Sequence, residues 1–193
     1  MTQAAQPNLA MRGASEDGTY AKPAIALHWI IALLIFAAFG LGLYMTDIPG
    51  FTPTKLRLYS YHKWIGITVL IFAVLRVVWR LTHPAPAPVK GMPAWQHKAA
   101  EAAHIALYLL ILAVPLTGYL LSVAAGIKVV YLGVWEMPMP FDKSDALKEI
   151  FEVAHQWLNW TMATIVVVHM LAALKHHIVD RDGTLRRMLP SLR

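Results

Sequence analysis

Four long apolar blocks restrict the fold of this chain more than any other feature of its sequence. The first covers residues 24–45, and the others lie at about 61–81, 95–123 and 147–178. A helix rises about 1.5 Å per residue, so about 20 apolar residues cross the roughly 30 Å hydrocarbon core of a bilayer. The first block is also too long for the apolar region of a secretory signal peptide. The sequence therefore predicts an all-α membrane protein with a bundle of four transmembrane helices.

The composition agrees with a protein whose main solvent is lipid. Of the 193 residues, 58% are hydrophobic and 15% are charged, whereas about 25% are charged in an ordinary soluble domain. Cysteine is absent, which excludes disulfides, thiolate metal sites, iron–sulfur clusters and covalently attached haem. The net charge of +6 comes from basic residues that flank the apolar blocks, and this pattern argues against nucleic-acid binding. A metal or cofactor must then be held by the nine histidines, by Met, by carboxylates or by packing.

The polar segments between the blocks indicate the domain organisation. Residues 1–22 lack a periodic apolar face, so we expect a disordered tail there. Proline and glycine mark connections at 46–60, 83–93 and 124–146, and Pro115 predicts a kink in the third helix. We therefore expect a tail at 1–22, a transmembrane domain at 23–180 and a short second tail at 181–193.

The basic residues of the loops predict the orientation in the membrane. Eleven Lys and Arg lie on the side of the two termini and six on the other side, and cytoplasmic loops carry the excess of basic residues. Both termini are therefore expected in the cytoplasm. The cytoplasmic set is Arg12, Lys22, Arg76, Arg80, Lys90, Lys98, Lys175, Arg181, Arg186, Arg187 and Arg193, and the opposite set is Lys55, Arg57, Lys63, Lys128, Lys143 and Lys148.

Histidines in the spans carry most of the functional signal, because an ionisable side chain is costly inside a membrane. The expected helix directions place His28 and His169 near the cytoplasmic side and His62 and His155 near the opposite side. His155 and His169 are 14 positions apart, which returns to nearly the same helical face and advances about 21 Å. Depth and face together predict two facing pairs, His62 with His155 and His28 with His169.

Two neutral imidazoles that face each other across a helical bundle match the two axial positions of a haem iron. Zinc would need a third or fourth ligand at each level. The sequence thus predicts two haems with bis-histidine iron. His104 could replace His28 as the ligand that pairs with His169. Alternatively, the histidines bind no haem and serve only packing or hydrogen bonding. Arg76 is expected either to pair with a haem propionate or to extend to the lipid headgroups.

The histidines lie in a recognisable set of segments. These are LHWIIALL, YHKWIGI, AHIALYLLILAVPLTGY, AHQWLNWTMATIVVVHMLAALKHH and RDGTLRRMLP. Together they resemble the bacterial cytochrome b561 family over nearly the whole chain from Tyr20 onward. The resemblance implies a four-helix cytochrome of the bacterial inner membrane with two b-type haems. Its ligands would be the residues His28, His62, His155 and His169. It also implies electron exchange with quinone, ubiquinone being the expected partner, and some similar proteins pass electrons from superoxide to ubiquinone.

A quinone site is expected at the cytoplasmic end. His176 lies seven residues beyond His169 on nearly the same helical face, and His177 and Lys90 are expected nearby. A histidine can exchange a proton with a quinone near neutral pH, although contact with phosphate headgroups is an alternative role for His176. On the opposite face, the six basic residues named above would attract superoxide, unless they are ordinary solvated loop charges.

Two other functions stay open at this point. In one, the chain is a membrane-anchor cytochrome b subunit that relays electrons for a partner dehydrogenase or hydrogenase, and the same histidines would serve it. In the other, a haem-free transporter or structural membrane protein uses histidines for packing or proton relay. The absorption spectrum of the purified protein separates the haem-free protein from the two cytochromes.

Overall fold

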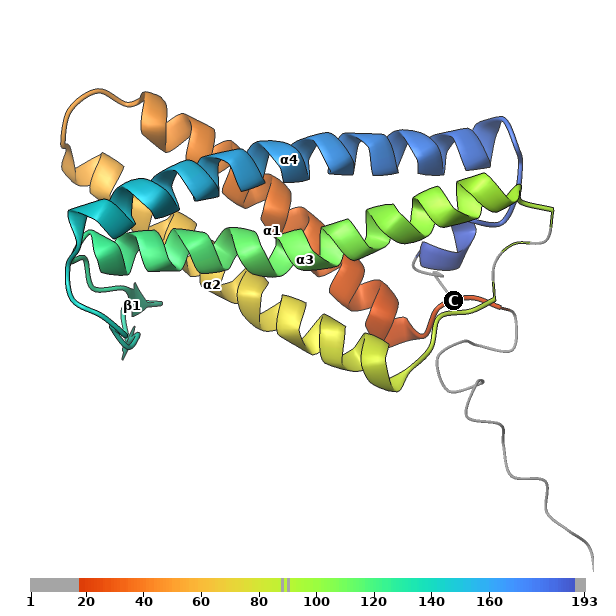
Figure 1. The fold of residues 1–193 in the computed structure, drawn as a ribbon, viewed down its shortest axis with the longest axis horizontal. Helices are drawn as coiled ribbons and strands as arrows, with labels where there is room; N and C mark the ends of the chain where they lie inside the picture. The colour runs from red at the N-terminus through yellow and green to blue at the C-terminus, as the bar shows by residue number, and fades with distance from the viewer. Residues whose placement is uncertain (1–17, 88, 90, 190–193) are drawn as a thin grey trace, which may run out of the picture.

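Four long helices form the body of the protein. The structure, a computed structural model, describes residues 18–87, 89 and 91–189. Within these residues the helices are α1 (Lys22–Asp47), α2 (Pro53–Thr82), α3 (Ala94–Ala124) and α4 (Asp145–Ile178). They run alongside one another in an elongated bundle (Figure 1), and each is long and apolar enough to cross a membrane. The prediction of a four-helix membrane bundle is therefore confirmed.

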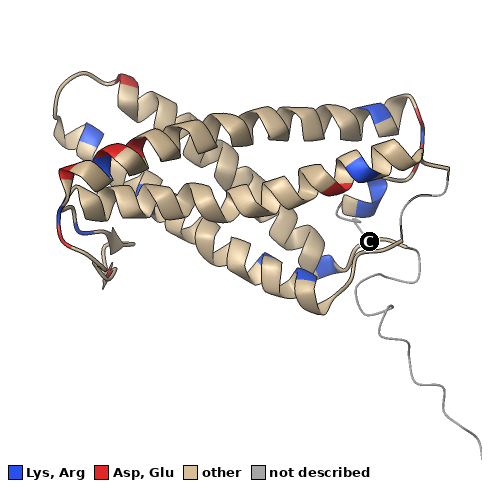
Figure 2. Ribbon diagram, in the orientation of Figure 1, with Lys and Arg blue, Asp and Glu red and all other residues tan. Residues whose placement is uncertain are grey.

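The two ends of the bundle differ in what they carry. At the end that we call the terminal end, α1 and α3 begin and α2 and α4 finish. The opposite end, which we call the hairpin end, carries a small β hairpin (Figure 1). Lys, Arg, Asp and Glu gather toward these two ends (Figure 2). This distribution suits a bundle whose middle is surrounded by hydrocarbon.

Helix α2 begins eight residues before the position expected from the sequence, so the boundary predicted at 61 is wrong. Pro53 was interpreted as a helix breaker, yet it occupies the first turn of α2. Proline is tolerated there because its missing N–H would have no partner within the helix. Thr52 caps the helix, since its Oγ1 accepts a hydrogen bond from the backbone N–H of Lys55 at 3.1 Å. The connection between the first two helices is correspondingly short.

The predicted loop at 124–146 contains a hairpin that the sequence did not suggest. Strands β1 (Val130–Tyr131) and β2 (Trp135–Glu136) pair in antiparallel fashion. The turn needs positive φ angles, which Gly133 adopts readily at 74° and Leu132 adopts at 53°. Trp64 of α2 donates from Nε1 to the carbonyl of Val130 at 2.7 Å, which fastens the hairpin to the bundle.

The helices pack mainly in sequence order, with α1 along α2, α2 along α3 and α3 along α4. Ile31, Ala73 and Ile111 form one buried cluster that joins the first three helices. Large apolar side chains elsewhere face outward, as lipid allows; Leu33, for example, is 67% exposed. Pro115 lies inside α3, which continues past it, and the kink expected there stays a prediction.

The chain after α4 folds back onto the terminal end. It includes the 3-10 helix η2 (Arg186–Met188), and the indole Nε1 of Trp29 donates to the carbonyl of Met188 at 2.7 Å. Arg187 donates from Nη1 to the carbonyl of Ala87 at 2.6 Å, so the segment also contacts the α2–α3 connection. Residues 1–17 of the expected tail lie outside the described residues, and the domain bounds stay a prediction.

Candidate functional site

One pair of imidazoles lies at the hairpin end, and we call His62 and His155 the hairpin-end pair. His62 comes from α2 and His155 from α4, and their ring centroids are 6.3 Å apart at an angle of 89°. His62 Nδ1 lies 3.0 Å from the carbonyl oxygen of Ala38 in α1, and His155 Nδ1 lies 3.0 Å from that of Val114 in α3. A carbonyl oxygen only accepts, so each Nδ1 carries the proton and each Nε2 keeps a free lone pair.

Three imidazoles meet nearer the terminal end, and we call them the terminal-end cluster. His28 of α1 and His169 of α4 have ring centroids 6.3 Å apart at an angle of 68°. His104 of α3 lies closer to His169, with 5.5 Å between the centroids. The structure therefore brings together the rings that the sequence paired by depth, and it also places the alternative ligand beside them.

The separations within the two predicted pairs fit a bis-imidazole iron. A metal–imidazole bond is about 2 Å long, which places each ring centroid about 3 Å from the metal and two opposite rings about 6 Å apart. Both predicted pairs have centroids 6.3 Å apart, whereas the His104–His169 separation of 5.5 Å is shorter than two opposed ligands require. The free Nε2 lone pairs of the hairpin-end pair are the donors that a haem iron takes. The residues present therefore fit b-type haem.

Arg76 reaches into the terminal-end cluster from α2. Its Nη1 donates to the carbonyl of Ala24 at 3.0 Å, and its Nη2 lies 3.4 Å from His28 Nδ1. The guanidinium carbon also lies 5.5 Å from the ring centroid of Tyr108. At 3.4 Å the contact between Arg76 Nη2 and His28 Nδ1 is long for a hydrogen bond, so it does not fix the tautomer of His28. The hydrogen bonding of His28 thus differs from that of the hairpin-end pair.

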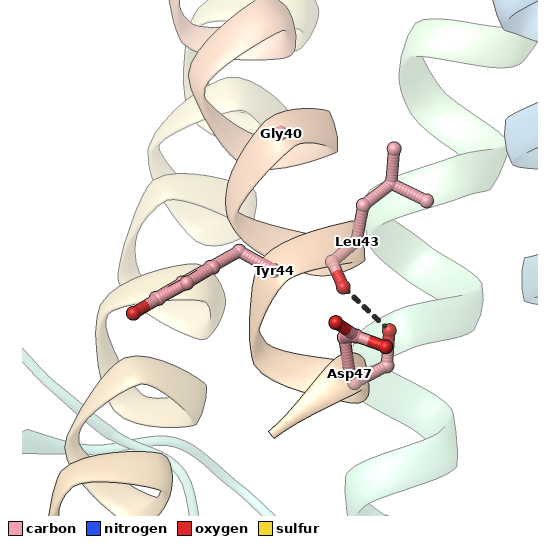
Figure 3. A pocket seen from close by; sticks show the side chains of 5 residues that line it. Gly40, Leu43, Tyr44 and Asp47 are labelled. Atoms are coloured by element: carbon pink, nitrogen blue, oxygen red, sulfur yellow. Dashed lines mark hydrogen bonds between the residues drawn. The ribbon is translucent and has the colours of Figure 1, made fainter.

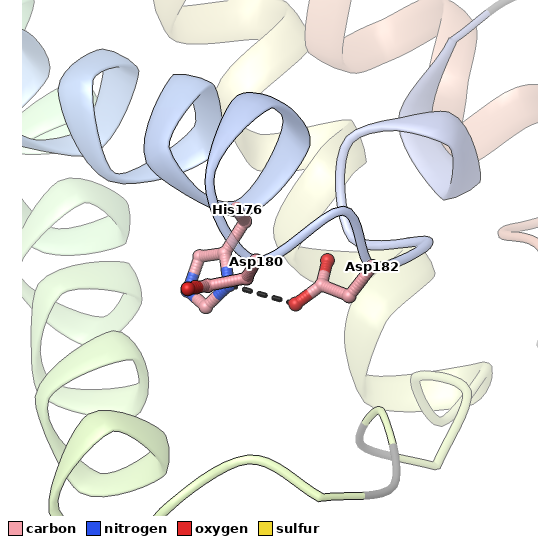
Figure 4. Close-up of side chains that lie close together, drawn as sticks. All are labelled: His176, Asp180 and Asp182. Carbon is pink, nitrogen blue, oxygen red and sulfur yellow. Dashed lines mark hydrogen bonds and ion pairs between the residues drawn. The ribbon is translucent and has the colours of Figure 1, made fainter.

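His176 forms a second polar centre at the end of α4 (Figure 4). Its Nδ1 lies 2.8 Å from Oδ2 of Asp182 and 3.0 Å from Oδ2 of Asp180. Lys175 also contacts Asp180 Oδ2 at 2.7 Å. Burial opposes ionisation of Asp182, but hydrogen bonds from Thr184 and His176 outweigh it and hold the pKa of Asp182 below its usual value. The imidazole of His176 is therefore held between two carboxylates.

Several members of these sites were missed by the sequence reasoning. Asp180 and Asp182 lie four and six positions after His176, and the four-residue spacing was a usable signal for contact at a helix end. The backbone carbonyls of Ala38 and Val114 leave no side-chain signal at all. His177 is exposed and is not part of the cluster around His176, and Lys90 lies outside the described residues.

Comparison with known proteins identifies the family. The family described as prokaryotic cytochrome b561 matches residues 19–191. The chain is 35% identical to cytochrome b561 homolog 2 of Escherichia coli (strain K12), over 88% of this chain and 90% of the relative. It is 32% identical to cytochrome b561 homolog 1 of the same organism, over 89% of this chain and 97% of the relative. It is 31% identical to the probable superoxide oxidase CybB of Yersinia pestis, over 88% of this chain and 94% of the relative.

The histidine geometry and the four spans agree with the family match, and the resemblance to the cytochrome b561 family predicted from the sequence segments is confirmed. The chain belongs to the prokaryotic cytochrome b561 family of multi-pass bacterial membrane proteins, which bind b-type haem and transfer electrons.

Proposed function

We propose that this chain is a two-haem cytochrome that carries electrons between the two faces of the bacterial inner membrane and exchanges them with quinone. The observation that carries the proposal is the recurrence of one ring separation, 6.3 Å, at two levels of a single bundle. A haem b held at each level would supply one-electron transfer through its iron. His62 with His155 would hold one haem, and His28 with His169 would hold the other.

Bis-histidine ligation limits the chemistry at each level. If two histidines hold the iron at each level, no position would be left where oxygen could bind, and this would favour electron transfer over oxygenation. The chain's own contribution is then to bury the site, orient the ligands and set the potential. The carbonyls of Ala38 and Val114 orient the hairpin-end pair, and Arg76 brings a positive charge to the terminal-end cluster.

The orientation follows from the basic residues. The sequence assigns eleven Lys and Arg to the side of the two termini and six to the other side, so we place the terminal end in the cytoplasm. His176 would then lie at the cytoplasmic face and the β hairpin at the opposite face. Arg76, turned inward beside His28, is suited to a haem propionate, and the neighbouring pocket lined by Arg80 and Tyr108 adds polar groups there.

His176 is our candidate for proton exchange with the quinone. Its Nδ1–H is shared with Asp182 and Asp180, which leaves Nε2 for a quinone oxygen. The carboxylates of these two residues would stabilise the imidazolium form of His176, which gives its proton to the quinone as the quinone is reduced. Lys90, in the sequence that connects α2 and α3, is a further candidate for a polar contact with the quinone.

Superoxide is the electron donor that the comparisons favour. The likeness to the probable superoxide oxidase of Yersinia pestis supports it, as do the basic residues of the hairpin end, which would attract an anion. The reaction balances when two superoxide ions each give up one electron and become oxygen. Ubiquinone takes up these two electrons, together with two protons from the cytoplasmic side, and becomes ubiquinol.

The purified protein provides the test. After expression with ample haem and extraction in detergent, we expect two b-type haems per chain and an absorption spectrum that changes on reduction with dithionite. Stopped-flow mixing with superoxide should reduce the haem, and added ubiquinone should reoxidise it. A preparation that binds no haem would overturn the proposal. Stoichiometric copurification with a dehydrogenase or hydrogenase would instead identify the chain as a membrane anchor.

A further inference from the structure

The two rings of the hairpin-end pair are held in the same way by two different helices. The Nδ1 of His62 meets the carbonyl of Ala38, and Gly42 lies four residues after Ala38 on α1. The Nδ1 of His155 meets the carbonyl of Val114, and Gly118 lies four residues after Val114 on α3. Because four residues make about one helical turn, each ring lies over a glycine and bonds one turn before it. We call Ala38 with Gly42, and Val114 with Gly118, the two glycine–carbonyl pairs.

The glycines leave room that any other residue would fill. A Cβ added to Gly118 would lie 2.8 Å from Cε1 and 3.2 Å from Nδ1 of His155. A Cβ added to Gly42 would lie 3.3 Å from Cε1 and 3.7 Å from Nδ1 of His62. The first contact is shorter than non-bonded carbon atoms allow, and the second is tight. A methyl group at either position therefore presses on the imidazole itself.

The imidazoles have little freedom to move away. His155 Nδ1 is bonded to the carbonyl of Val114 at 3.0 Å and also lies 3.3 Å from Oγ1 of Thr117. A shift of the ring would lengthen both contacts and leave a buried polar group without its partner, which is costly in a membrane interior. The same holds for His62, whose Nδ1 is hydrogen-bonded to the carbonyl of Ala38.

We propose that Gly42 and Gly118 are positioning residues for the axial ligands of the hairpin-end haem. Each glycine admits the ring, and the carbonyl one turn before it fixes the ring's tautomer and direction, so that Nε2 is presented to the iron. The proposal rests on the proposed function, since it takes His62 and His155 as haem ligands. It assigns these two glycines to the imidazoles, whereas glycines in membrane spans otherwise serve close approach of helices or of a cofactor.

Other glycines of the bundle lack this relation and supply a control. A Cβ added to Gly40 would meet no atom within 4 Å. Gly40 lies two residues before Gly42 on the same helix, at an open depression beside Leu43 and Tyr44 (Figure 3). The Gly40→Ala variant therefore changes the same helix by the same methyl group without touching an imidazole.

The experiment compares Gly118→Ala, Gly42→Ala, Gly40→Ala and His155→Ala in the detergent-purified, haem-loaded protein. The readouts are haem content per chain, the two low-spin electron paramagnetic resonance signals and the two midpoint potentials. We expect Gly118→Ala to lose one haem of two, with loss of the same resonance signal that His155→Ala removes. We expect Gly42→Ala, whose contact is milder, to keep both haems and to shift that one signal and its potential. Gly40→Ala should match the unsubstituted protein in all three readouts.

The outcomes separate this proposal from the proposed function. If His155→Ala removes one haem while Gly118→Ala and Gly42→Ala keep both signals and potentials unchanged, the glycine assignment is wrong and the haem ligation stands. If His155→Ala retains two haems, both proposals fall. If Gly118→Ala does not fold, the position of the resonance signal in Gly42→Ala decides alone, because that variant places its methyl group at a tolerable 3.3 Å.

Discussion

The choice of ligand at the terminal-end cluster yields the sharpest prediction. His169 has two neighbouring imidazoles, His28 at 6.3 Å and His104 at 5.5 Å between ring centroids. Two imidazoles on opposite sides of one metal, each bonded at about 2 Å, have ring centroids about 6 Å apart, because each centroid lies about 1 Å beyond its ligating nitrogen. The His104 separation falls short of the 6.3 Å seen in both predicted pairs by nearly 1 Å, which is a large misfit for bonds that vary by about 0.2 Å. We therefore expect His28 to be the ligand and His104 a neighbour.

Two alanine variants measure this choice. His28→Ala should lower the haem content from two per chain to one and remove one low-spin resonance signal, because its iron loses one of two axial ligands. His104→Ala should keep two haems and both signals, with a shift in the potential of the haem at its level. The assay is haem quantification and paramagnetic resonance on protein matched for amount by amino-acid analysis. The reverse pattern, with a haem lost from His104→Ala and retained in His28→Ala, would show that the separation argument chose the wrong ring.

Three further predictions concern the charged groups. Arg76→Gln should lower the midpoint potential of the terminal-level haem by tens of millivolts, since a nearby positive charge favours the reduced iron; an unchanged potentiometric titration would contradict this. Asp182→Asn should destabilise the protein by about 1.5–3 kcal/mol near neutral pH, because a charged acceptor of His176 is lost. The pKa of Asp182 in the folded protein lies below the unfolded value of 3.8, so the stabilisation by this carboxylate is present above pH 3.8. It disappears as the pH falls through the folded pKa. Below that pH, the thermal unfolding curves of Asp182→Asn and of the unsubstituted protein should coincide. The rate of haem reduction by superoxide should fall as ionic strength rises, and a salt-independent rate would remove the role of the basic hairpin end.

Most of the architecture could be predicted from the sequence, because membrane spans are encoded in the length and composition of apolar runs. The predicted bounds failed where local chemistry decided the outcome. Thr52 and Pro53 begin a helix where proline was interpreted as a helix breaker. The hairpin at 130–136 depends on positive φ angles at Leu132 and Gly133, and a Leu-Gly sequence gives little indication of them. Such turns are fixed by contacts with the bundle, as the bond from Trp64 to Val130 illustrates.

Depth along each span was enough to pair the histidines, because a helix converts sequence separation into distance at a fixed rise. Depth alone could not decide between His28 and His104, since both lie at the level of His169. That choice depends on lateral distances of about 1 Å, which arise from how α1 and α3 pack against their neighbours. Periodicity fixes a face and a level, and it leaves the spacing between helices undetermined.

The glycines illustrate a different limit of sequence reasoning. Gly40, Gly42, Gly66 and Gly118 look alike in the sequence, and helix packing or close approach of a cofactor would explain each of them. In the structure Gly42 and Gly118 contact imidazoles, whereas Cβ atoms at Gly40 and Gly66 would meet nothing within 4 Å. What distinguishes Gly42 and Gly118 is that the backbone carbonyl one turn before each of them accepts a hydrogen bond from an imidazole, and every residue has such a carbonyl. The hydrogen bond that orients a ligating histidine can thus come from a backbone carbonyl, which has no sequence signature. The glycine one turn later is the part of this arrangement that mutation can test.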